Sequence, residues 1–272
     1  MDDLVLYRKQ NDKTVKTNNL SEIFDNWKGN NEHWLFISPH DDDIIIGSGL
    51  LLQKAVKDNI KITVLITTDG SMGYCEESHR NSIIGLRNKE TLESFKIVGI
   101  SDVFWLNFPD SQLTMFTGKR KAFKDDPCVI EGFTGLQNAY THYLRKLKPT
   151  RVFLPSGADL HVDHKITYQE TLISLFHSNS MIWPELGSSL KDIPKVYEMA
   201  VYCDFIEKPD IKITGNDVHL NKKLEAILAY HSQEKIIKSL VNKIETGGTV
   251  EYFRDVKFSL YSPDNYKNLF KD

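Results

Sequence analysis

The sequence predicts an α/β fold, in the form of a Rossmann-like three-layer sandwich with a mostly parallel sheet. Short apolar runs alternate along the chain with segments of helical period, an alternation that is typical of βαβ units. The apolar runs are nearly continuous, as expected for strands that are covered on both faces. Polar clusters follow two of these runs, and open α/β sheets bind ligands at the carboxyl ends of their strands. We therefore expect the functional site at that edge of the sheet.

Five apolar runs are expected to form the strands. In KITVLITT, residues 61–68, Ile62, Val64 and Ile66 alternate while Leu65 fills the other face, which is the two-residue period of a strand. The remaining runs are 33–39, 102–108, 151–156 and 195–203.

Five segments between and after the strands are expected to be helices, and their bounds are 47–58, 86–99, 134–149, 164–178 and 221–241. Gly99 ends the second segment and Pro149 ends the third, and both residue types are common helix stops. The segments 110–133 and 178–194 have no clear period. We expect long loops there, and loops of that length are often functional.

The composition fits a single domain over residues 1–272, with the motif-bearing core at about 34–240. A chain of this length can form one α/β domain. It has 34 basic and 37 acidic residues and a net charge of −3, so its electrostatics imply no nucleic-acid partner.

The sequence indicates neither a membrane anchor nor a secretory signal. Its longest apolar runs are too short to span a bilayer, and its first residues are polar and acidic. Cys75, Cys128 and Cys203 are scattered and odd in number, which argues against a disulfide scaffold. We expect a cytoplasmic protein.

The two polar clusters contain the side chains of a metal site. His40 is followed by three aspartates, Asp41–Asp43, and the later cluster holds His161, Asp163 and His164. Two histidines and a carboxylate suit a zinc ion with an open position, and a divalent cation offsets the cost of gathering acids. The aspartates could instead cap a helix N-terminus. Because two clusters follow two strands, a metal site is favoured over capping.

These residues resemble motifs of the PIG-L/LmbE family of zinc-dependent N-acetylglucosaminyl deacetylases. The family's A-H-P-D-D-E motif is similar to PHDDDI at 39–44, and its H-P-D-H motif is similar to HVDH at 161–164. Weaker matches occur in the family's order, and they lie at 67–73, 86–100, 108–113 and 223–233.

The resemblance implies a role for each matching residue. Three residues would be the zinc ligands: His40, Asp43 and His164. Asp42 would be the general base, His161 would stabilise the oxyanion, and Asp163 would orient a neighbouring histidine. Four positions depart from the family pattern. Asp41 and Val162 replace prolines, Ile44 replaces a glutamate, and Tyr230 stands where many members have histidine.

Two further residues are candidates for substrate binding. Arg87 could contact a hydroxyl or phosphate of the substrate, or it could be a solvated helix arginine or the i,i+3 partner of Glu90. The resemblance implies that Asp110 contacts sugar hydroxyls, whereas its position after an expected strand also fits a turn or cap role.

The expected function is removal of the acetyl group from an N-acetylated amino sugar of a small conjugate, with release of acetate. Zn²⁺ is the expected ion, although Fe²⁺ or Co²⁺ would accept the same ligands, and a homo-oligomer is compatible with the sequence. One alternative is a metal-dependent amide or ester hydrolase of a non-sugar substrate. Another is a non-catalytic sugar-binding homologue, against which the spare carboxylate of Asp42 argues. No G-x-G-x-x-G follows the first expected strand, which disfavours a dinucleotide site.

Overall fold

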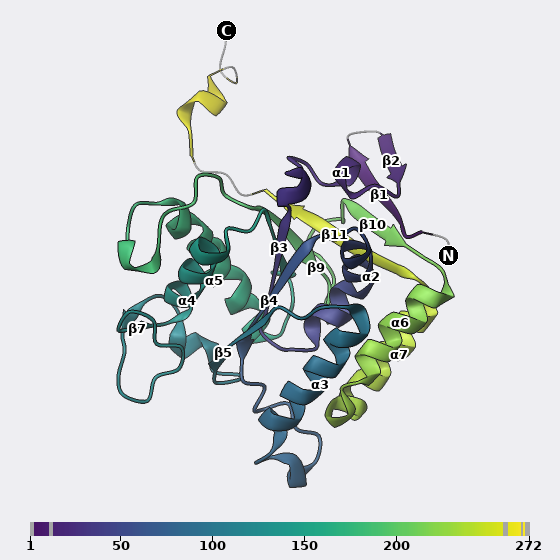
Figure 1. The fold of residues 1–272 in the computed structure, drawn as a ribbon, viewed down its shortest axis with the longest axis horizontal. Helices are drawn as coiled ribbons and strands as arrows, with labels where there is room; N and C mark the ends of the chain where they lie inside the picture. The colour runs from purple at the N-terminus through teal and green to yellow at the C-terminus, as the bar shows by residue number, and fades with distance from the viewer. Residues whose placement is uncertain (1–2, 11–12, 258–260, 268, 270–272) are drawn as a thin grey trace.

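The computed structural model describes residues 3–10, 13–257, 261–267 and 269, and a nine-stranded sheet forms its centre (Figure 1). The strands in spatial order are β2 (Lys13–Thr17), β1 (Val5–Gln10), β10 (Ile211–Thr214), β11 (Val250–Val256), β9 (Lys195–Met199), β8 (Arg151–Pro155), β3 (His33–Ser38), β4 (Lys61–Thr68) and β5 (Val103–Phe108). The α/β architecture expected from the sequence is confirmed.

The sheet is mixed, with one parallel half and one antiparallel half. Strands β9, β8, β3, β4 and β5 run parallel, and they correspond to the five expected strands. Strands β2, β1, β10 and β11 add an antiparallel half, so the expectation of a mostly parallel sheet holds for the first half alone. The added strands carry polar side chains on one face, as in KTVKT of β2, and therefore lack the continuous apolar signal of buried parallel strands.

Helices cover both faces of the parallel half. One layer contains α2 (Asp43–Lys57), α3 (Ile83–Val98), α6 (Asp217–Leu228) and α7 (Glu234–Gly247). The other contains α4 (Leu136–Leu147) and α5 (Val162–Asn179). Alternate residues of β3 enter the two cores: Trp34 and Phe36 belong to the first, and Leu35 and Ile37 to the second. This is the expected three-layer arrangement.

Two expected helices differ from those in the structure. The segment 221–241 is broken into α6 and α7 by the turn η5 (His231–Gln233), because Ser232 bonds to Glu90 instead of continuing the helix. Helix α2 begins at Asp43 rather than at residue 47, with Asp42 as the residue before it.

Short elements occupy the remaining chain, including the two expected loops. Residues 110–133 contain η3 (Leu113–Phe116) and β6 (Arg120–Lys121), which pairs with β7 (Phe133–Thr134). Residues 178–194 contain η4 (Pro184–Leu186). The other short elements are α1 (Leu20–Ile23), η1 (Gly29–Asn31), η2 (Glu77–His79) and η6 (Pro263–Tyr266).

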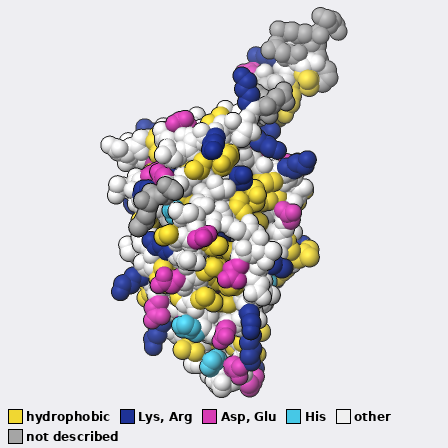
Figure 2. Space-filling view, turned by 90° about the vertical axis from the view of Figure 1, so that its right-hand side faces the viewer, with side chains coloured by type: hydrophobic (Ala, Val, Ile, Leu, Met, Phe, Trp, Pro, Cys, Tyr) yellow, Lys and Arg dark blue, Asp and Glu magenta, His cyan; other side chains and the backbone are white. Residues whose placement is uncertain are grey.

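No described helix combines the length and apolarity needed to cross a bilayer. On the face drawn in Figure 2, acidic and basic side chains are interspersed, with hydrophobic side chains between them.

A buried ion pair anchors helix α2 to the antiparallel half of the sheet. Lys223 on α6 lies 2.8 Å from Glu251 on β11, and both side chains are buried. The Glu251 carboxylate also accepts hydrogen bonds from the backbone N–H groups of Leu50 and Leu51, at 2.7 and 3.0 Å. A Cβ at Gly49 would lie 2.7 Å from Lys223 Cγ, so glycine is required for this close approach.

We expect Lys223→Met to destabilise the protein by about 3–5 kcal/mol, because it leaves the buried Glu251 charge without a partner. Urea unfolding followed by circular dichroism measures the loss. The matched control is Lys222→Met on the same helix; Lys222 has no ion pair among the described residues, and its loss should be about 0.5 kcal/mol or less. Equal losses in the two variants would contradict the role of the pair.

Candidate metal centre

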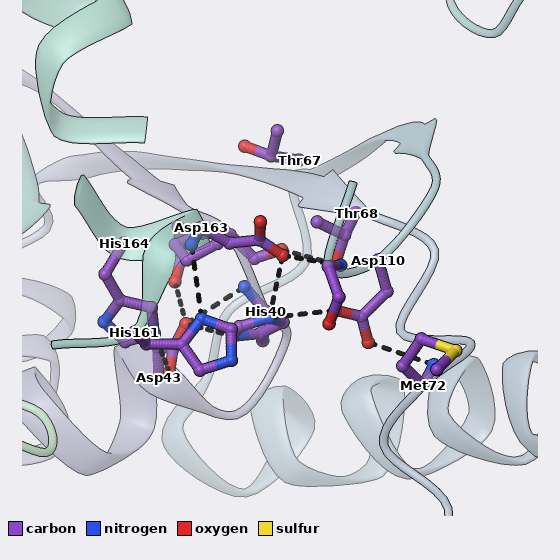
Figure 3. Close-up of polar contacts among 12 residues, drawn as sticks. His40, Asp43, Thr67, Thr68, Met72, Asp110, His161, Asp163 and His164 are labelled. Atoms are coloured by element: carbon purple, nitrogen blue, oxygen red, sulfur yellow. Dashed lines mark hydrogen bonds and ion pairs between the residues drawn. The ribbon is translucent and has the colours of Figure 1, made fainter. Parts of the chain in front are cut away.

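The two polar clusters meet at the carboxyl edge of the parallel half of the sheet. Strands β3 and β8 are parallel neighbours, with Phe36 opposite Phe153. His40 lies between the end of β3 and the start of α2, and His161 is the residue before α5, which follows β8. The convergence expected from strand order is therefore present (Figure 3).

Asp43 lies between two histidines, one from each cluster. Its Oδ2 atom is 3.4 Å from His40 Nδ1, and its Oδ1 atom is 3.2 Å from His164 Nε2. The Ser38 hydroxyl and the His40 backbone N–H donate to Oδ2 at 2.8 and 3.0 Å. These bonds fix the carboxylate from the side of the chain that precedes α2.

The other ring nitrogen of each histidine faces a second carboxylate. His40 Nε2 is 3.3 Å from Asp110 Oδ1, and His164 Nδ1 is 3.2 Å from Asp159 Oδ2. Histidines that bind metals characteristically place their second nitrogen against a carboxylate or carbonyl, which sets the tautomer and the ring orientation. His40 and His164 thus have the surroundings of metal ligands on both sides of their rings.

The residues around Asp43 are of the kinds that bind a divalent metal ion, and the expected ligands His40, Asp43 and His164 lie together there. Asp43 Oδ1 and His164 Nε2 are buried, and neither has a hydrogen-bond partner among the described residues. Tetrahedral coordination with bonds of about 2.0–2.2 Å separates ligand atoms by roughly 3.3–3.6 Å. His164 Nε2 lies 3.2 Å from Asp43 Oδ1 and His40 Nδ1 lies 3.4 Å from Asp43 Oδ2, so each histidine is at about this distance from a different oxygen of the carboxylate. Two sets of possible ligand atoms lie within 4.8 Å of one another: those of His40, His161 and His164, and those of His40, Asp110 and Asp163. His161 therefore borders the same position, and His40 belongs to both sets.

The electrostatics of the cluster couple metal binding to protons. Burial opposes a charge on His164, but Asp43 and Asp159 outweigh it and raise the pKa of His164 to about 9. Burial also opposes the charge of Asp43, yet His164 and His40 hold the pKa of Asp43 well below its ordinary value. The histidine and the carboxylate therefore favour an ion pair, and a metal ion must displace the proton to bind.

Asp42 is not one of the expected metal ligands, and its side chain does not cap helix α2. It precedes the first residue of α2, but its side chain makes no capping hydrogen bond. Its Oδ1 atom accepts instead from Arg87 at 3.2 Å. Burial raises the pKa of Asp42 to about 6, and Arg87 limits the rise. Asp42 thus remains an unassigned buried acid beside the candidate ligand Asp43.

His161 presents one ring nitrogen to the interior of the site. Its Nδ1 accepts from the Asp163 backbone N–H at 3.3 Å, so the proton of the neutral ring is on Nε2. Burial and the charges of His40 and His164 lower the pKa of His161. The Asp163 carboxylate accepts from Ser111 N–H at 2.7 Å and lies 3.7 Å from His40 Nε2.

Arg87 and Asp110 are both buried in the site. Arg87 donates to Asp41 and Asp42. The expectation of a solvated helix arginine is wrong, because the Arg87 side chain is buried. Its ion pairs among the described residues are with Asp41 and Asp42 rather than with Glu90, which accepts hydrogen bonds from Ser232. Asp110 accepts from Met72 N–H at 3.1 Å as well as facing His40, so its carboxylate already has protein partners.

Sequence reasoning missed Asp159, which holds the second nitrogen of His164. Its side chain also accepts from the backbone N–H groups of His161 and Tyr202, at 3.0 and 3.2 Å. Burial opposes the charge of Asp159, but the contact with His164 and these N–H groups lower its pKa to about 2. The sequence offered one sign of this role, because Asp159 is an acid two residues before the HVDH motif at 161–164.

A sequence profile of the PIG-L family, described as GlcNAc-PI de-N-acetylase, matches residues 35–174, which are more than half of the chain. The chain belongs to the PIG-L family. Among curated relatives, a diacetylchitobiose deacetylase of Thermococcus kodakarensis is 34% identical over 88 residues, or 32% of this chain. That match spans only 33% of the relative. The uncharacterized deacetylase YaiS of Escherichia coli is 26% identical over 165 residues, which are 60% of this chain and 80% of the relative.

Solved structures share the PIG-L fold with this chain. The N,N′-diacetylchitobiose deacetylase of Pyrococcus horikoshii has a TM-score of 0.64 and 23% identity, covering 83% of this chain and 84% of that one. The conserved protein TT1542 of Thermus thermophilus has a TM-score of 0.65 and 22% identity, with 85% and 97% covered. The hydratase GalB of Pseudomonas putida has a TM-score of 0.59 and 15% identity, with 85% and 98% covered.

We expect Asp159→Asn to weaken zinc binding by about 10–100-fold, because the amide cannot hold His164 in the same tautomer and orientation. Competition with a chelating dye measures the affinity of the purified protein. Asp204→Asn, an exposed acid in the loop after β9, is the control and should bind zinc like the unaltered protein. Unchanged affinity in Asp159→Asn would exclude a supporting role for this carboxylate.

Proposed function

We propose that the protein is a zinc-dependent hydrolase that removes the acetyl group from an N-acetylated amino sugar of the GlcNAc type. The products are acetate and a free amine. The observation that carries this proposal is the pair of adjacent aspartates: Asp43 faces both histidines, while Asp42 stays free of cap and ligand contacts. The chain also belongs to a family described as a de-N-acetylase, which supports amide hydrolysis as the reaction.

His40, Asp43 and His164 would hold the ion, which when bound activates water and polarises a carbonyl group. Asp42 would take the proton of the attacking water as general base and pass it to the departing amine as general acid. His161 would donate its Nε2–H to the carbonyl oxygen as negative charge develops there, while Asp163 steadies His161 through its backbone N–H. The acetamide C–N bond breaks, and one water molecule is divided between acetate and amine.

The wider properties of the protein complete the proposal. The chain would act as one domain over 1–272, of which the ends lie outside the described residues. Cys75, Cys128 and Cys203 are free, which supports the reducing cytoplasm as its location. The substrate would be a small amino-sugar conjugate, and the bound ion would be zinc in preference to iron or cobalt.

Two other functions use the same fold. A metal-dependent amide or ester hydrolase would differ only in the loops around the site, and the hydratase GalB shows that this fold also occurs in an enzyme of another class. A non-catalytic sugar-binding protein would have no use for Asp42, which is buried beside the ligands. The free acid therefore favours catalysis.

The purified, zinc-loaded protein is expected to release acetate from N-acetylglucosaminides in step with a new primary amine. Removal of the ion with a chelator should abolish release, and added zinc should restore it, because the ion supplies the activated water. An acetate assay and an amine-reactive dye give the two readings, with acetylated peptides and aryl acetates as the comparison panel. Turnover of the panel without turnover of any acetylated sugar would favour the non-sugar alternative.

We expect Asp42→Asn to keep its zinc but to lose about 10²–10⁴-fold in turnover, since the amide cannot accept the water proton. Metal analysis and acetate release on the same sample separate the two effects. Asp192→Asn, an exposed acid far along the chain, serves as the control. Near-normal activity in a fully metal-loaded Asp42→Asn protein would reject Asp42 as the base.

A further inference from the structure

One face of the antiparallel half of the sheet is open to solvent. Leu6 on β1 and Ile213 on β10 belong to the first core, on the opposite face. Side chains alternate between the two faces along a strand, so Tyr7 and Lys212, which pair across these strands, point away from that core. Tyr252 on β11 is directly opposite Lys212 and is 44% exposed. The face that carries Tyr7, Lys212 and Tyr252 is therefore accessible to a ligand.

Lysine and tyrosine alternate in a row across this open face. Lys16 on β2 is opposite Tyr7, so the order from the edge strand inward is Lys16, Tyr7, Lys212 and Tyr252. The ammonium groups of Lys16 and Lys212 lie 5.7 and 4.3 Å from the centre of the Tyr7 ring. Residues directly opposite each other on antiparallel strands are side-chain neighbours. A ligand that contacts the Tyr252 ring would therefore lie within reach of the Lys212 ammonium group.

The lysines of this face have no acidic partner in the part of the chain that the structure describes. Lys9 on β1 and Lys208, in the loop before β10, lie beside the row. Neither they nor Lys16 and Lys212 form an ion pair with a described residue. Lys9, Lys16 and Lys208 are also exposed. Their ammonium groups are thus free to bind an anion.

The acidic side chains near this face are already engaged. Glu198 and Glu207 both form ion pairs with Arg254. The Asp210 carboxylate accepts from the backbone N–H of Asp255 at 3.0 Å. Asp210 is the one acid beside the three lysines that line the hollow between the row and the segment 208–210, and no histidine lines it. Three positive charges against one negative leave this lining with a net charge of +2.

The hollow has the size and the lining of a small-molecule site. Its volume of about 300 Å³ is at the lower end of the range for such sites. Tyr7 and Tyr252 line it together with Lys9, Lys208 and Lys212. Aromatic side chains stack on planar rings such as nucleobases, and lysine is a common ligand of phosphate groups. The lining therefore combines the two contacts that a nucleoside phosphate requires.

We propose that this hollow binds a nucleoside phosphate, with the base against Tyr252 and the phosphates at the lysines. Nucleic-acid-binding domains are typically strongly basic, whereas this chain has a net charge of −3, so a small ligand is favoured over a long nucleic acid. The hollow lies on β1, β10 and β11, and β9 separates these strands from β8 and β3, where the metal centre lies. It is a second site, and it does not depend on the proposed deacetylase function.

The first test is calorimetry on the full chain with its metal removed, so that phosphate cannot bind an ion at the metal centre. The probes are ADP, adenosine and pyrophosphate. We expect ADP to bind with a Kd below about 1 mM. Adenosine and pyrophosphate should each bind about fivefold more weakly or worse, because each offers only one of the two contacts. A Kd for ADP above that limit would overturn the site.

Two other outcomes of the calorimetry would change the ligand. Pyrophosphate that binds as tightly as ADP would show attraction of anions in general and would overturn the nucleoside assignment. A single-stranded RNA oligomer that binds about tenfold more tightly than ADP would assign this face to nucleic acid instead.

Variants separate the contact with the base from the contact with the phosphates. Tyr252→Leu should weaken ADP by about fivefold or more while pyrophosphate binding stays within about twofold. Lys212→Met should weaken both ligands by about fivefold or more, because it removes a charge-assisted hydrogen bond. Lys238→Met, which alters an exposed lysine on α7, is the control and should bind both normally. Unchanged ADP binding in Tyr252→Leu and Lys212→Met would overturn the proposal.

A labelling experiment locates the ligand in the unaltered protein and does not depend on the folding of any variant. The full, metal-free chain is irradiated with an azido analogue of ADP, and the labelled peptides are identified by mass spectrometry. We expect the label in β1, in the segment 208–214 or in β11, and an excess of ADP should prevent it. Label confined to the peptides that contain His40 or His161 would place the ligand at the metal centre and overturn the second site.

Discussion

The buried carboxylate of Asp43 is the constraint on which the rest of the site depends. A carboxylate removed from water is strongly destabilised unless charges or hydrogen bonds compensate it. Here the compensation comes from Ser38 and His40 before α2 and from His164 on α5. The end of β3, the start of α2 and the first turn of α5 must therefore keep their relative positions. The parallel pairing of β3 with β8 fixes that arrangement.

The acids around Asp43 are kept apart by what each of them contacts. Asp110 and Asp159 face the outer nitrogens of the two candidate ligands, whereas Asp41 and Asp42 share one guanidinium. Identical side chains thus acquire different chemical characters from their neighbours, with the pKa of Asp159 lowered to about 2 and that of Asp42 raised to about 6. Environment rather than residue type separates the candidate base from the supporting acids.

The sequence contained enough information for the parallel half of the sheet and for the meeting of the two clusters, because apolar runs and strand order are local signals. The antiparallel half could not be predicted from the sequence, because strands such as KTVKT have few apolar residues. Nor could it reveal that Arg87 is enclosed or that Asp159 supports His164. Those facts depend on contacts between residues far apart along the chain or on loop geometry, for example Gln233 with Gly73.

The turn between α6 and α7 supports the surroundings of the candidate site from the late part of the chain. The Tyr230 hydroxyl donates to the backbone carbonyl of Asp41, and the Ser232 N–H donates to Glu90 on α3. The Gln233 side chain donates to the Gly73 carbonyl in the loop above Arg87. The family profile ends at residue 174, well before this turn. A fragment limited to the profile would include the three candidate ligands and Asp42. It would lack Gln233, whose hydrogen bond fixes the loop that covers Arg87. The contacts that enclose the candidate site therefore come from a longer stretch of the chain than the one by which its family is identified.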